Sequence, residues 1–344
     1  MTNKVLVMGC GGLGGIVSAH LAELGVEVTG VSRNPDIAHA VCERGFRLCG
    51  ATSDRTVAGR VVSQVPDERF DLAVLATQPT DVEEAARQVA PRLTDDGVVV
   101  VLQNGLCEER VAEVLGDRDR VVGAVVAWGG RMIEPGVYDR TSSGGTTIGA
   151  LGDVDDRALV MVEALLSSIG PVERTDNLMG ARWSKLIINC AVSALGTLNG
   201  THLGPVVRTL MARRVALGIM TEGEAVARAQ GVTLKKVSGT IDLGWMALTD
   251  AERSGRGGVS LAAKHTMLLA VGLRYRRLYS SLLRAIEAGK PPAIDFLNGE
   301  IVRAGRRREI PTPVNQAVCE RIWGMARNEC TPGPHQIESL AALL

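Results

Sequence analysis

The segment Val5-Leu6-Val7-Met8-Gly9-Cys10-Gly11-Gly12-Leu13-Gly14 joins an apolar run to a glycine-rich run. The apolar run predicts a strand, the pattern through Leu24 predicts a helix, and residues 26–31 predict a second strand. A G-x-G-x-x-G run that follows a strand and opens a helix has the context that dinucleotide binding requires. Gly9 would then permit the tight turn, Gly11 the approach of a pyrophosphate, and Gly14 close helix packing. The alternative interpretation is a glycine-rich turn without a ligand.

The first half of the chain continues to alternate between strand and helix. The pattern predicts further strands at 71–76, 97–102 and 121–126. Helices are predicted between them at 80–93 and 108–115. Apolar runs separated by helices indicate a parallel sheet that is covered on both faces. Residues 136–140 and 146–149 predict short antiparallel strands that close this sheet. The predicted fold class is therefore α/β, with an N-terminal Rossmann doubly wound parallel sheet.

A change of pattern near residue 176 predicts a C-terminal all-helical domain. Asp176 or Asn177 can N-cap a long helix through Thr197, and helical periodicity returns at 205–230, 261–288, 294–307 and 314–327. We therefore expect a nucleotide-binding domain over 1–176 and a helical domain for substrate and dimer contacts over 177–330. Gly and Pro in residues 331–344 predict a poorly ordered tail.

The end of the second strand distinguishes between two cofactors. NAD enzymes usually place an acid there, about 20 residues after the glycine motif, where it binds the ribose hydroxyls. This chain reads Gly30-Val31-Ser32-Arg33-Asn34, without an acid. Ser32 and Arg33 can instead bind a 2′-phosphate, which favours NADP. The alternative interpretation is that Arg33 is an ordinary solvated loop residue.

Composition excludes several classes of protein. The 38 basic and 38 acidic residues balance, whereas nucleic-acid-binding proteins usually carry a basic excess. The seven cysteines include no C-x-x-C pair and the five histidines no H-E-x-x-H pattern, so no metal site is expected. The odd cysteine count is typical of a reducing compartment. We expect a cytoplasmic protein without a membrane span, because no apolar stretch reaches the ~20 residues that a span needs.

A second group of polar residues lies on the predicted helix after residue 177. Lys185 and Asn189 are four residues apart and share one helical face, with Ser193 one turn further along. An ammonium and an amide among Leu186, Ile187 and Ile188 suggest polar groups that face a cleft, and a buried lysine is suited to proton transfer. By spacing alone, a helix with a polar outer stripe explains the pattern equally well.

Taken together, these segments resemble the ketopantoate reductase family (2-dehydropantoate 2-reductases) over nearly the whole chain. The landmarks are GCGGLGG at 9–15, Arg33, Gln103-Asn104-Gly105, Pro135-Gly136-Val137, W-x-K-L-x-x-N-C at 183–190, Ser280-Ser281, I-D-x-x-N-G at 294–299, Ile310-Pro311 and Asn315. Several ordered landmarks at compatible spacing are far more specific than any one of them.

The resemblance implies that NADPH delivers a hydride to the C2 carbonyl of a 2-oxo acid, which gives the (R)-2-hydroxy acid. It implies that Lys185 is the general acid that protonates the carbonyl oxygen. Asn104 would lie beside the nicotinamide and orient the lysine and the substrate. Asn189 and Ser281 match positions that hydrogen-bond the substrate, and the active site would lie in a cleft between the domains.

The chain departs from the family pattern mainly at positions that face the substrate. Ala293 stands where the family carries a glutamate that binds the pantoate hydroxyl. Ser193 replaces an asparagine of the substrate site, and Leu278 replaces a polar residue. On the cofactor side, Gln78 replaces a lysine that follows the fourth strand. These changes favour a working reductase whose substrate is more apolar than ketopantoate.

Two other hypotheses remain open from the sequence. One is an authentic 2-dehydropantoate 2-reductase in which Glu300 or Glu287 performs the task of the missing glutamate. The other is a catalytically idle NADP-binding sensor, against which the retained Lys185, Asn104 and Asn189 count. The oligomeric state is open, with a homodimer as one candidate.

Overall fold

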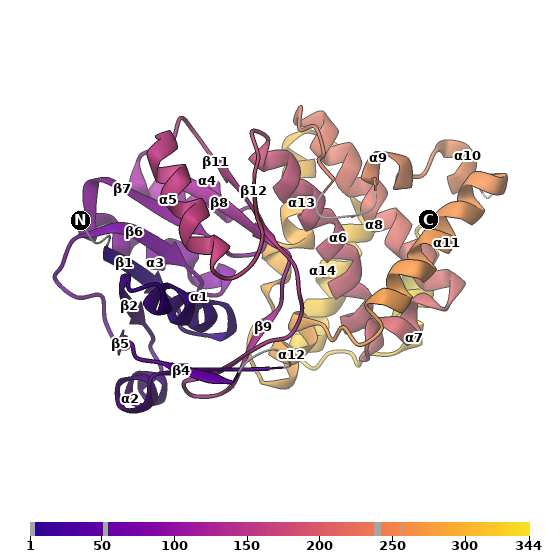
Figure 1. Cartoon of the computed structure of the whole chain (residues 1–344). Coiled ribbons are helices and arrows are strands. Elements are labelled where there is room, and N and C mark those ends of the chain that lie inside the picture. Colours follow the sequence, from indigo (N-terminus) through magenta and orange to yellow (C-terminus); the bar gives the residue numbers. More distant parts are fainter. Residues whose placement is uncertain (1–3, 51–53, 237–241, 255) are drawn as a thin grey trace. The chain divides into compact units, whose positions relative to one another are not determined.

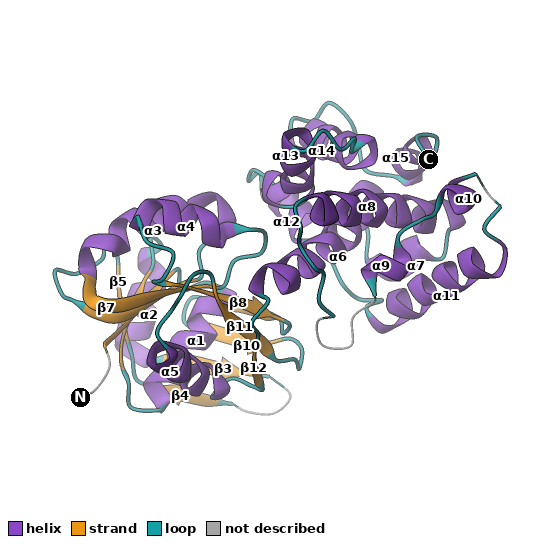
Figure 2. Ribbon diagram, turned by 90° about the horizontal axis from the view of Figure 1, so that it is seen from above, coloured by secondary structure: helices purple, strands orange, loops and turns teal. Residues whose placement is uncertain are grey.

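The computed structural model describes residues 4–50, 54–236, 242–254 and 256–344. The chain divides into two compact units, unit 1 up to Leu178 and unit 2 from Met179 onward. This division falls two residues after the boundary that the composition predicts. Unit 1 combines strands and helices, whereas unit 2 is helical (Figures 1 and 2).

Unit 1 is built on an eight-stranded sheet in the order β12-β11-β8-β7-β6-β1-β2-β5. Six neighbouring strands, β8, β7, β6, β1, β2 and β5, run parallel to one another. At the other end of the sheet, β11 is antiparallel to β8, and β12 is parallel to β11. The strands are β1 (Lys4–Met8), β2 (Glu27–Val31), β5 (Arg60–Val62), β6 (Phe70–Leu75), β7 (Leu93–Val101), β8 (Val121–Val126), β11 (Thr146–Ala150) and β12 (Val172–Arg174). The predicted Rossmann sheet is therefore confirmed.

Helices cover both faces of this sheet, as expected for strands that are apolar on both sides. In Figure 2, α3 and α4 lie on one side of it, and α1 and α5 on the other. The helices are α1 (Gly12–Glu23), α2 (Pro35–Arg44), α3 (Val82–Val89), α4 (Cys107–Leu115) and α5 (Asp156–Ser167), with short 3₁₀ turns η1 (Pro79–Asp81) and η2 (Ala90–Arg92). Because β1 lies between β2 and β6, the chain winds away from β1 in both directions, and loops diverge at the carboxyl ends of these strands.

The prediction that residues 136–140 and 146–149 both close the main sheet was right for one segment only. Segment 146–149 does form β11, which is antiparallel to β8 and belongs to the main sheet. The other segment forms β10 (Val137–Arg140) in a separate sheet, in the order β4 (Arg55–Val57), β3 (Phe46–Cys49), β10 and β9 (Gly130–Glu134). Tyr138 explains this placement, because its buried ring packs against Gly15 of α1 and its hydroxyl donates to the Cys10 carbonyl oxygen at 3.0 Å.

Unit 2 consists of helices packed around α8. Its elements are α6 (Leu178–Asn199), α7 (Leu203–Val207), α8 (Leu210–Ala229), α9 (Leu243–Met246), α10 (Asp250–Arg253), α11 (Gly258–Arg274), α12 (Ser281–Glu287), η3 (Ala293–Phe296), α13 (Asn298–Arg307), α14 (Pro313–Ala326) and α15 (Pro334–Ala341). Two of the predicted long helices are each divided in two. Side-chain caps explain the new starts, since Thr209 accepts from the Ala212 N–H and Ser280 from the Leu282 N–H.

The predicted disordered tail was wrong, because residues 334–341 form α15. Ile337 and Leu340 are buried in this helix, which packs against α8. Pro334 occupies its first turn, where a proline costs no hydrogen bond. The Gly-Pro pair that suggested a break in the chain is instead the start of a helix.

Candidate active site

The glycine-rich run of unit 1 forms a tight turn between β1 and α1. Gly9 has φ +95°, a conformation that L side chains rarely adopt, and its N–H donates to the Val31 carbonyl oxygen at 2.9 Å. A Cβ at Gly9 would lie 2.9 Å from the Thr77 nitrogen, so this turn also packs against the loop after β6. A Cβ at Gly14 would lie 1.9 Å from the Gly9 carbonyl oxygen, which shows why the helix needs glycine there.

Gly11 differs from the other glycines of the motif because nothing lies within 4 Å of the place that a Cβ would take. It occupies the N-cap position of α1 and is exposed, and no side chain caps the helix there among the described residues. A helix N-terminus with free N–H groups attracts anions. The turn therefore fits a dinucleotide pyrophosphate. The open space lies at Gly11, the glycine that the motif assigns to the approach of the pyrophosphate.

Other motif residues serve the packing of the turn. The Cys10 side chain is buried, and its sulfur would lie 2.5 Å from a Cβ at Gly30. Burial raises the pKa of the Cys10 thiol to about 12, so this group is an inert part of the core. Gly12 packs against Gly130, where a Cβ would lie 2.6 Å from the carbonyl oxygen, and Leu13 is half-buried. At Cys10, therefore, the backbone and not the buried side chain is available to a ligand.

The end of β2 places Ser32 and Arg33 at the carboxyl edge of the sheet. Ser32 is buried, and its Oγ accepts from the Asn34 N–H at 3.2 Å, while Asn34 caps α2. Arg33 is exposed, and its Nη2 lies 2.6 Å from Oδ2 of Asp81. Sequence reasoning missed Asp81, although an acid soon after β6 could have been noticed as a neighbour of the β2 terminus.

The loops after β6 and β7 lie at the same edge of the sheet and contact each other. Gln103 is buried, and its Nε2 donates to Oγ1 of Thr77 at 3.1 Å. Asn104 follows it as an exposed residue, and Gly105 has φ +97°. Gln78 is exposed as well. The structure thus brings the glycine turn, Ser32, Arg33, Gln78 and Asn104 to one edge of unit 1.

In unit 2, the polar residues of α6 form a stripe with a common degree of burial. Lys185, Asn189 and Ser193 are all half-buried, whereas Leu186, Ile187 and Cys190 between them are fully buried. Residues four apart lie on the same helical face. Charged and amide groups at the margin of an apolar core can bind a polar ligand that lies against this face of the helix.

A serine and a threonine extend this stripe toward α12. Thr197, one turn beyond Ser193, donates its hydroxyl to Ser280 Oγ at 2.8 Å, and Ser280 is buried. Ser281, the predicted substrate residue, comes next and is exposed. Thr197 was missed by sequence reasoning, although the four-residue spacing from Lys185 through Ser193 leads directly to it. Leu278 is also exposed, before the cap of α12.

Ala293 begins η3 and is half-buried. The neighbouring landmarks Asn298 and Asn315 have a structural role. Asn298 Nδ2 donates to Asn315 Oδ1 at 2.9 Å, and the buried Glu222 accepts from the backbone N–H groups of Val314 and Asn315 at 2.8 and 2.9 Å. Burial raises the pKa of Glu222, although these donors oppose the effect. This carboxylate caps α14, so the asparagines hold α8, α13 and α14 together.

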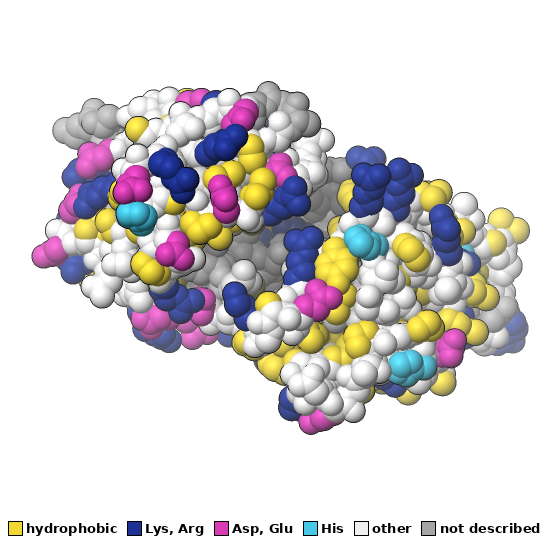
Figure 3. All heavy atoms as spheres, turned by 90° about the horizontal axis from the view of Figure 1, so that it is seen from below, with side chains coloured by type: hydrophobic (Ala, Val, Ile, Leu, Met, Phe, Trp, Pro, Cys, Tyr) yellow, Lys and Arg dark blue, Asp and Glu magenta, His cyan; other side chains and the backbone are white. Residues whose placement is uncertain are grey.

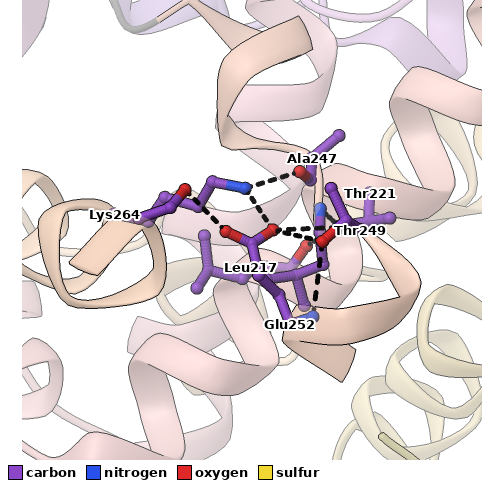
Figure 4. Close-up of polar contacts among 8 residues, drawn as sticks. Leu217, Thr221, Ala247, Thr249, Glu252 and Lys264 are labelled. Carbon is purple, nitrogen blue, oxygen red and sulfur yellow. Dashed lines mark hydrogen bonds and ion pairs between the residues drawn. The ribbon is translucent and has the colours of Figure 1, made fainter. Parts of the chain in front are cut away.

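A buried ion pair lies elsewhere in unit 2, between α10 and α11 (Figure 4). Lys264 Nζ lies 2.5 Å from Oε2 of Glu252 and donates to the Ala247 carbonyl oxygen at 2.8 Å. Thr249 and Ser260 also donate to the Glu252 carboxylate. Burial alone would raise the pKa of Glu252, but these donors outweigh it and lower the pKa to about 2. Its partners are all structural, so we assign it to stability.

The two units carry opposite charge. Residues up to 178 contain 16 basic and 26 acidic residues, whereas residues 179–344 contain 22 basic and 12 acidic residues. On the face of unit 2 in Figure 3, Lys and Arg side chains predominate over acidic ones. The helical unit therefore attracts anions.

The described residues contain no cluster of three or more His, Cys, Asp or Glu side chains that could hold a metal ion. In the same parts of the chain, no helix has the length and apolar character needed to cross a bilayer.

A parallel sheet with a glycine turn before its first helix, joined in one chain to a helical unit, is an architecture typical of dinucleotide-dependent oxidoreductases. Two family models match the chain, "Ketopantoate reductase PanE/ApbA" over residues 5–153 and its C-terminal counterpart over residues 177–326. The chain belongs to the ketopantoate reductase family, whose members are oxidoreductases.

Similar proteins agree with this assignment. A 2-dehydropantoate 2-reductase of Pyrococcus horikoshii is 26% identical over 314 residues, which cover 91% of this chain and 94% of that protein. A PanE/ApbA family ketopantoate reductase structure from Ralstonia eutropha aligns with a TM-score of 0.78 at 28% identity, covering 95% of this chain and 99% of that one. The fold alone is shared with a ternary structure of D-mandelate dehydrogenase with NADH and anilino(oxo)acetate, which has a TM-score of 0.80 at 20% identity and covers 94% of this chain and 99% of that one.

Proposed function

We propose that this protein is an NADPH-dependent reductase that converts a 2-oxo acid to the (R)-2-hydroxy acid, and that its substrate is more apolar than ketopantoate. The observation that carries the proposal is the polar stripe of α6. Lys185, Asn189 and Ser193 are half-buried on one face of α6, as are Ile188 and Val192, and they lie beside the fully buried Leu186, Ile187 and Cys190. Such a placement is more typical of a ligand site than of a solvated outer stripe.

Each group has a role in this proposal. The glycine turn and the N-terminus of α1 would bind the pyrophosphate, and Ser32, Arg33 and Gln78 the adenosine end. A bound reduced nicotinamide supplies the hydride. Lys185 would donate a proton to the carbonyl oxygen as negative charge develops there, and Asn104 would orient the lysine and the substrate. Asn189, Ser193 and Ser281 would hydrogen-bond the substrate, whose carboxylate suits the basic unit 2.

The preference for an apolar substrate rests on Ala293. A site that hydrogen-bonds a substrate hydroxyl rejects analogues without it, because its own polar group is left unpaired. Ala293 offers no hydrogen-bonding group, so a buried substrate hydroxyl would have no partner there. The site would then favour a substrate without the hydroxyl. The D-mandelate dehydrogenase complex with anilino(oxo)acetate shows that another protein of this fold accommodates an aromatic ligand. The names of the archaeal relatives favour the second candidate, 2-dehydropantoate itself.

Comparison of kcat/KM for ketopantoate with that for aliphatic and aromatic 2-oxo acids tests this preference. We expect an apolar 2-oxo acid to be the better substrate, and Ala293→Glu to shift the ratio of kcat/KM toward ketopantoate by about tenfold or more. Ala288→Glu, a change of the same size and charge at an exposed position just after α12, is the matched control. Efficient reduction of ketopantoate by the unmodified protein, better than any apolar acid tested, would contradict the proposal and favour the second candidate.

A further inference from the structure

Arg33, the residue assigned to the 2′-phosphate, already has an anionic partner within the protein. Its Nη2 lies 2.6 Å from Oδ2 of Asp81, with side-chain exposures of 84% and 34%. Arg33 follows β2 and Asp81 ends η1 after β6, and both strands flank β1. The pair therefore bridges the carboxyl edge of the sheet where the adenosine end of a dinucleotide is expected.

Asp81 lies at the N-cap of α3, yet its carboxylate pairs with Arg33 and does not cap the helix. Asp81 is the N-cap residue of α3, where an aspartate commonly accepts a hydrogen bond from the first turn. Its side chain makes no capping bond. In the same unit, Asn34 and Asp155 both cap their helices with their side chains. The carboxylate of Asp81 thus contacts Arg33 in place of the helix N-terminus.

The surrounding charges do not compensate for Asp81. Gln78, exposed in the same loop, brings no positive charge to this edge. Glu83 and Glu84 follow Asp81 in the first turn of α3, and they pair with Arg87 and Arg110 on their own side of the unit. A 2′-phosphate that approaches Arg33 would meet a carboxylate already in contact with the guanidinium, and phosphate and carboxylate repel each other.

We propose that Asp81 sets the cofactor preference of this protein by competing with the 2′-phosphate for Arg33. The proposal rests on the proposed function only in requiring that unit 1 binds a nicotinamide dinucleotide. NADPH binds at the cost of breaking the Arg33–Asp81 pair, whereas NADH has a hydroxyl at this position and leaves the pair intact. The protein therefore binds both dinucleotides, with a preference for NADPH much smaller than Arg33 alone would give.

Dissociation constants of NADPH and NADH, measured by fluorescence titration of the full chain, test the proposal without reference to any substrate. Asp81→Asn keeps the size of the side chain and removes its charge. Because exposed pairs contribute up to about fivefold in an equilibrium constant, the substitution should tighten NADPH binding about three- to fivefold. NADH binding should stay within about twofold. In an Arg33→Ala background the same substitution should change NADPH affinity less.

Glu84→Gln is the matched control, because it removes one negative charge from the same helix without touching Arg33. It should leave the ratio of the two dissociation constants unchanged. An unchanged ratio in Asp81→Asn, or weaker NADPH binding, would overturn the role of Asp81 while leaving dinucleotide binding established. If Glu84→Gln tightened NADPH binding as much as Asp81→Asn, the cause would be the overall negative charge of this helix and not the Arg33–Asp81 pair. Failure of the unmodified protein to bind either dinucleotide would overturn this inference and the proposed function together.

Discussion

At the scale of single residues, the groups proposed to act on a ligand differ from the groups that hold the helices together. Lys185 and Asn104 are assigned to the chemistry, whereas Asn298, Asn315 and Glu222 are tied into hydrogen bonds between helices. Lys185, Asn104, Asn298 and Asn315 are all landmarks of the family resemblance, so the sequence alone could not separate the two roles. The distinction became visible only from burial and hydrogen-bond partners.

Lys185→Ala should lower turnover by about 100-fold or more if the lysine is the general acid. NADPH affinity should stay nearly the same, since the glycine turn and Arg33 belong to unit 1. Steady-state kinetics with the best 2-oxo acid and NADPH titration provide the two readouts. Lys236→Ala, an exposed lysine of the same unit, is the control. Near-normal turnover in a folded Lys185→Ala protein would remove this residue from the mechanism.

The same added methyl group should lower NADPH affinity at one glycine of the turn and protein stability at another. In Gly11→Ala the Cβ enters open space, so the free energy of unfolding should hardly change while NADPH affinity falls about tenfold or more. In Gly14→Ala the Cβ would lie 1.9 Å from the Gly9 carbonyl oxygen, and we expect a loss of stability of about 2 kcal/mol or more. Thermal unfolding and dinucleotide titration measure both effects. Equal behaviour of the two variants would contradict the assignment of Gly11 to the pyrophosphate.

At the scale of elements, periodicity predicted what depends on local pattern and missed what depends on distant partners. The strands β1, β2, β6, β7 and β8 follow from apolar runs within the sequence. The assignment of β10 to a second sheet depends on Tyr138 meeting Gly15 and Cys10, more than a hundred residues away. The helix α15 depends on burial of Ile337 and Leu340 against α8. No local pattern contains these contacts.

The candidate site shows the same limit. The glycine turn, Arg33 and the stripe of α6 could be found by motif and spacing, because each belongs to one continuous segment. Spacing along the chain does not pair Asp81 with Arg33, since 48 residues separate them. Their contact follows from the strand order, which places β2 and β6 on either side of β1.

The buried pair between α10 and α11 gives a prediction about pH. Glu252 has a pKa of about 2 in the folded chain against an ordinary value of 4.5. A lowered folded pKa stabilises the protein above the unfolded value, and this contribution is lost as the pH falls from about 4.5 toward 2. Denaturant unfolding of the wild-type protein between pH 7 and 3 should show a loss on the order of 2 kcal/mol that Glu252→Gln does not show.

Lys264→Met supplies the complementary observation. It leaves the Glu252 carboxylate buried without its ammonium partner, which should cost about 3–5 kcal/mol at neutral pH. The double variant with Glu252→Gln should recover much of this loss, because no charge then remains buried. If the wild-type protein and Glu252→Gln lost stability equally on acidification, Glu252 would not be the group responsible.

At the scale of the whole molecule, the balanced charge of the chain conceals an uneven distribution of charge between the two units. The sequence sums to a formal net charge of zero, yet unit 1 has an excess of acidic residues and unit 2 an excess of basic ones. The excess on unit 2 suits a small carboxylate substrate, and no polyanionic partner is needed to explain it. This asymmetry could have been read from the sequence once a boundary near residue 176 was drawn.

The rate of NADPH oxidation across a panel of 2-oxo acids tests the proposed reduction of a 2-oxo acid most directly. We expect oxidation that depends on the 2-oxo acid, with formation of the (R)-2-hydroxy acid measured by chiral chromatography. An apolar member of the panel should give the highest kcat/KM. A folded protein that binds NADPH but oxidises it no faster with any 2-oxo acid than without one would contradict the claim and favour the sensor hypothesis.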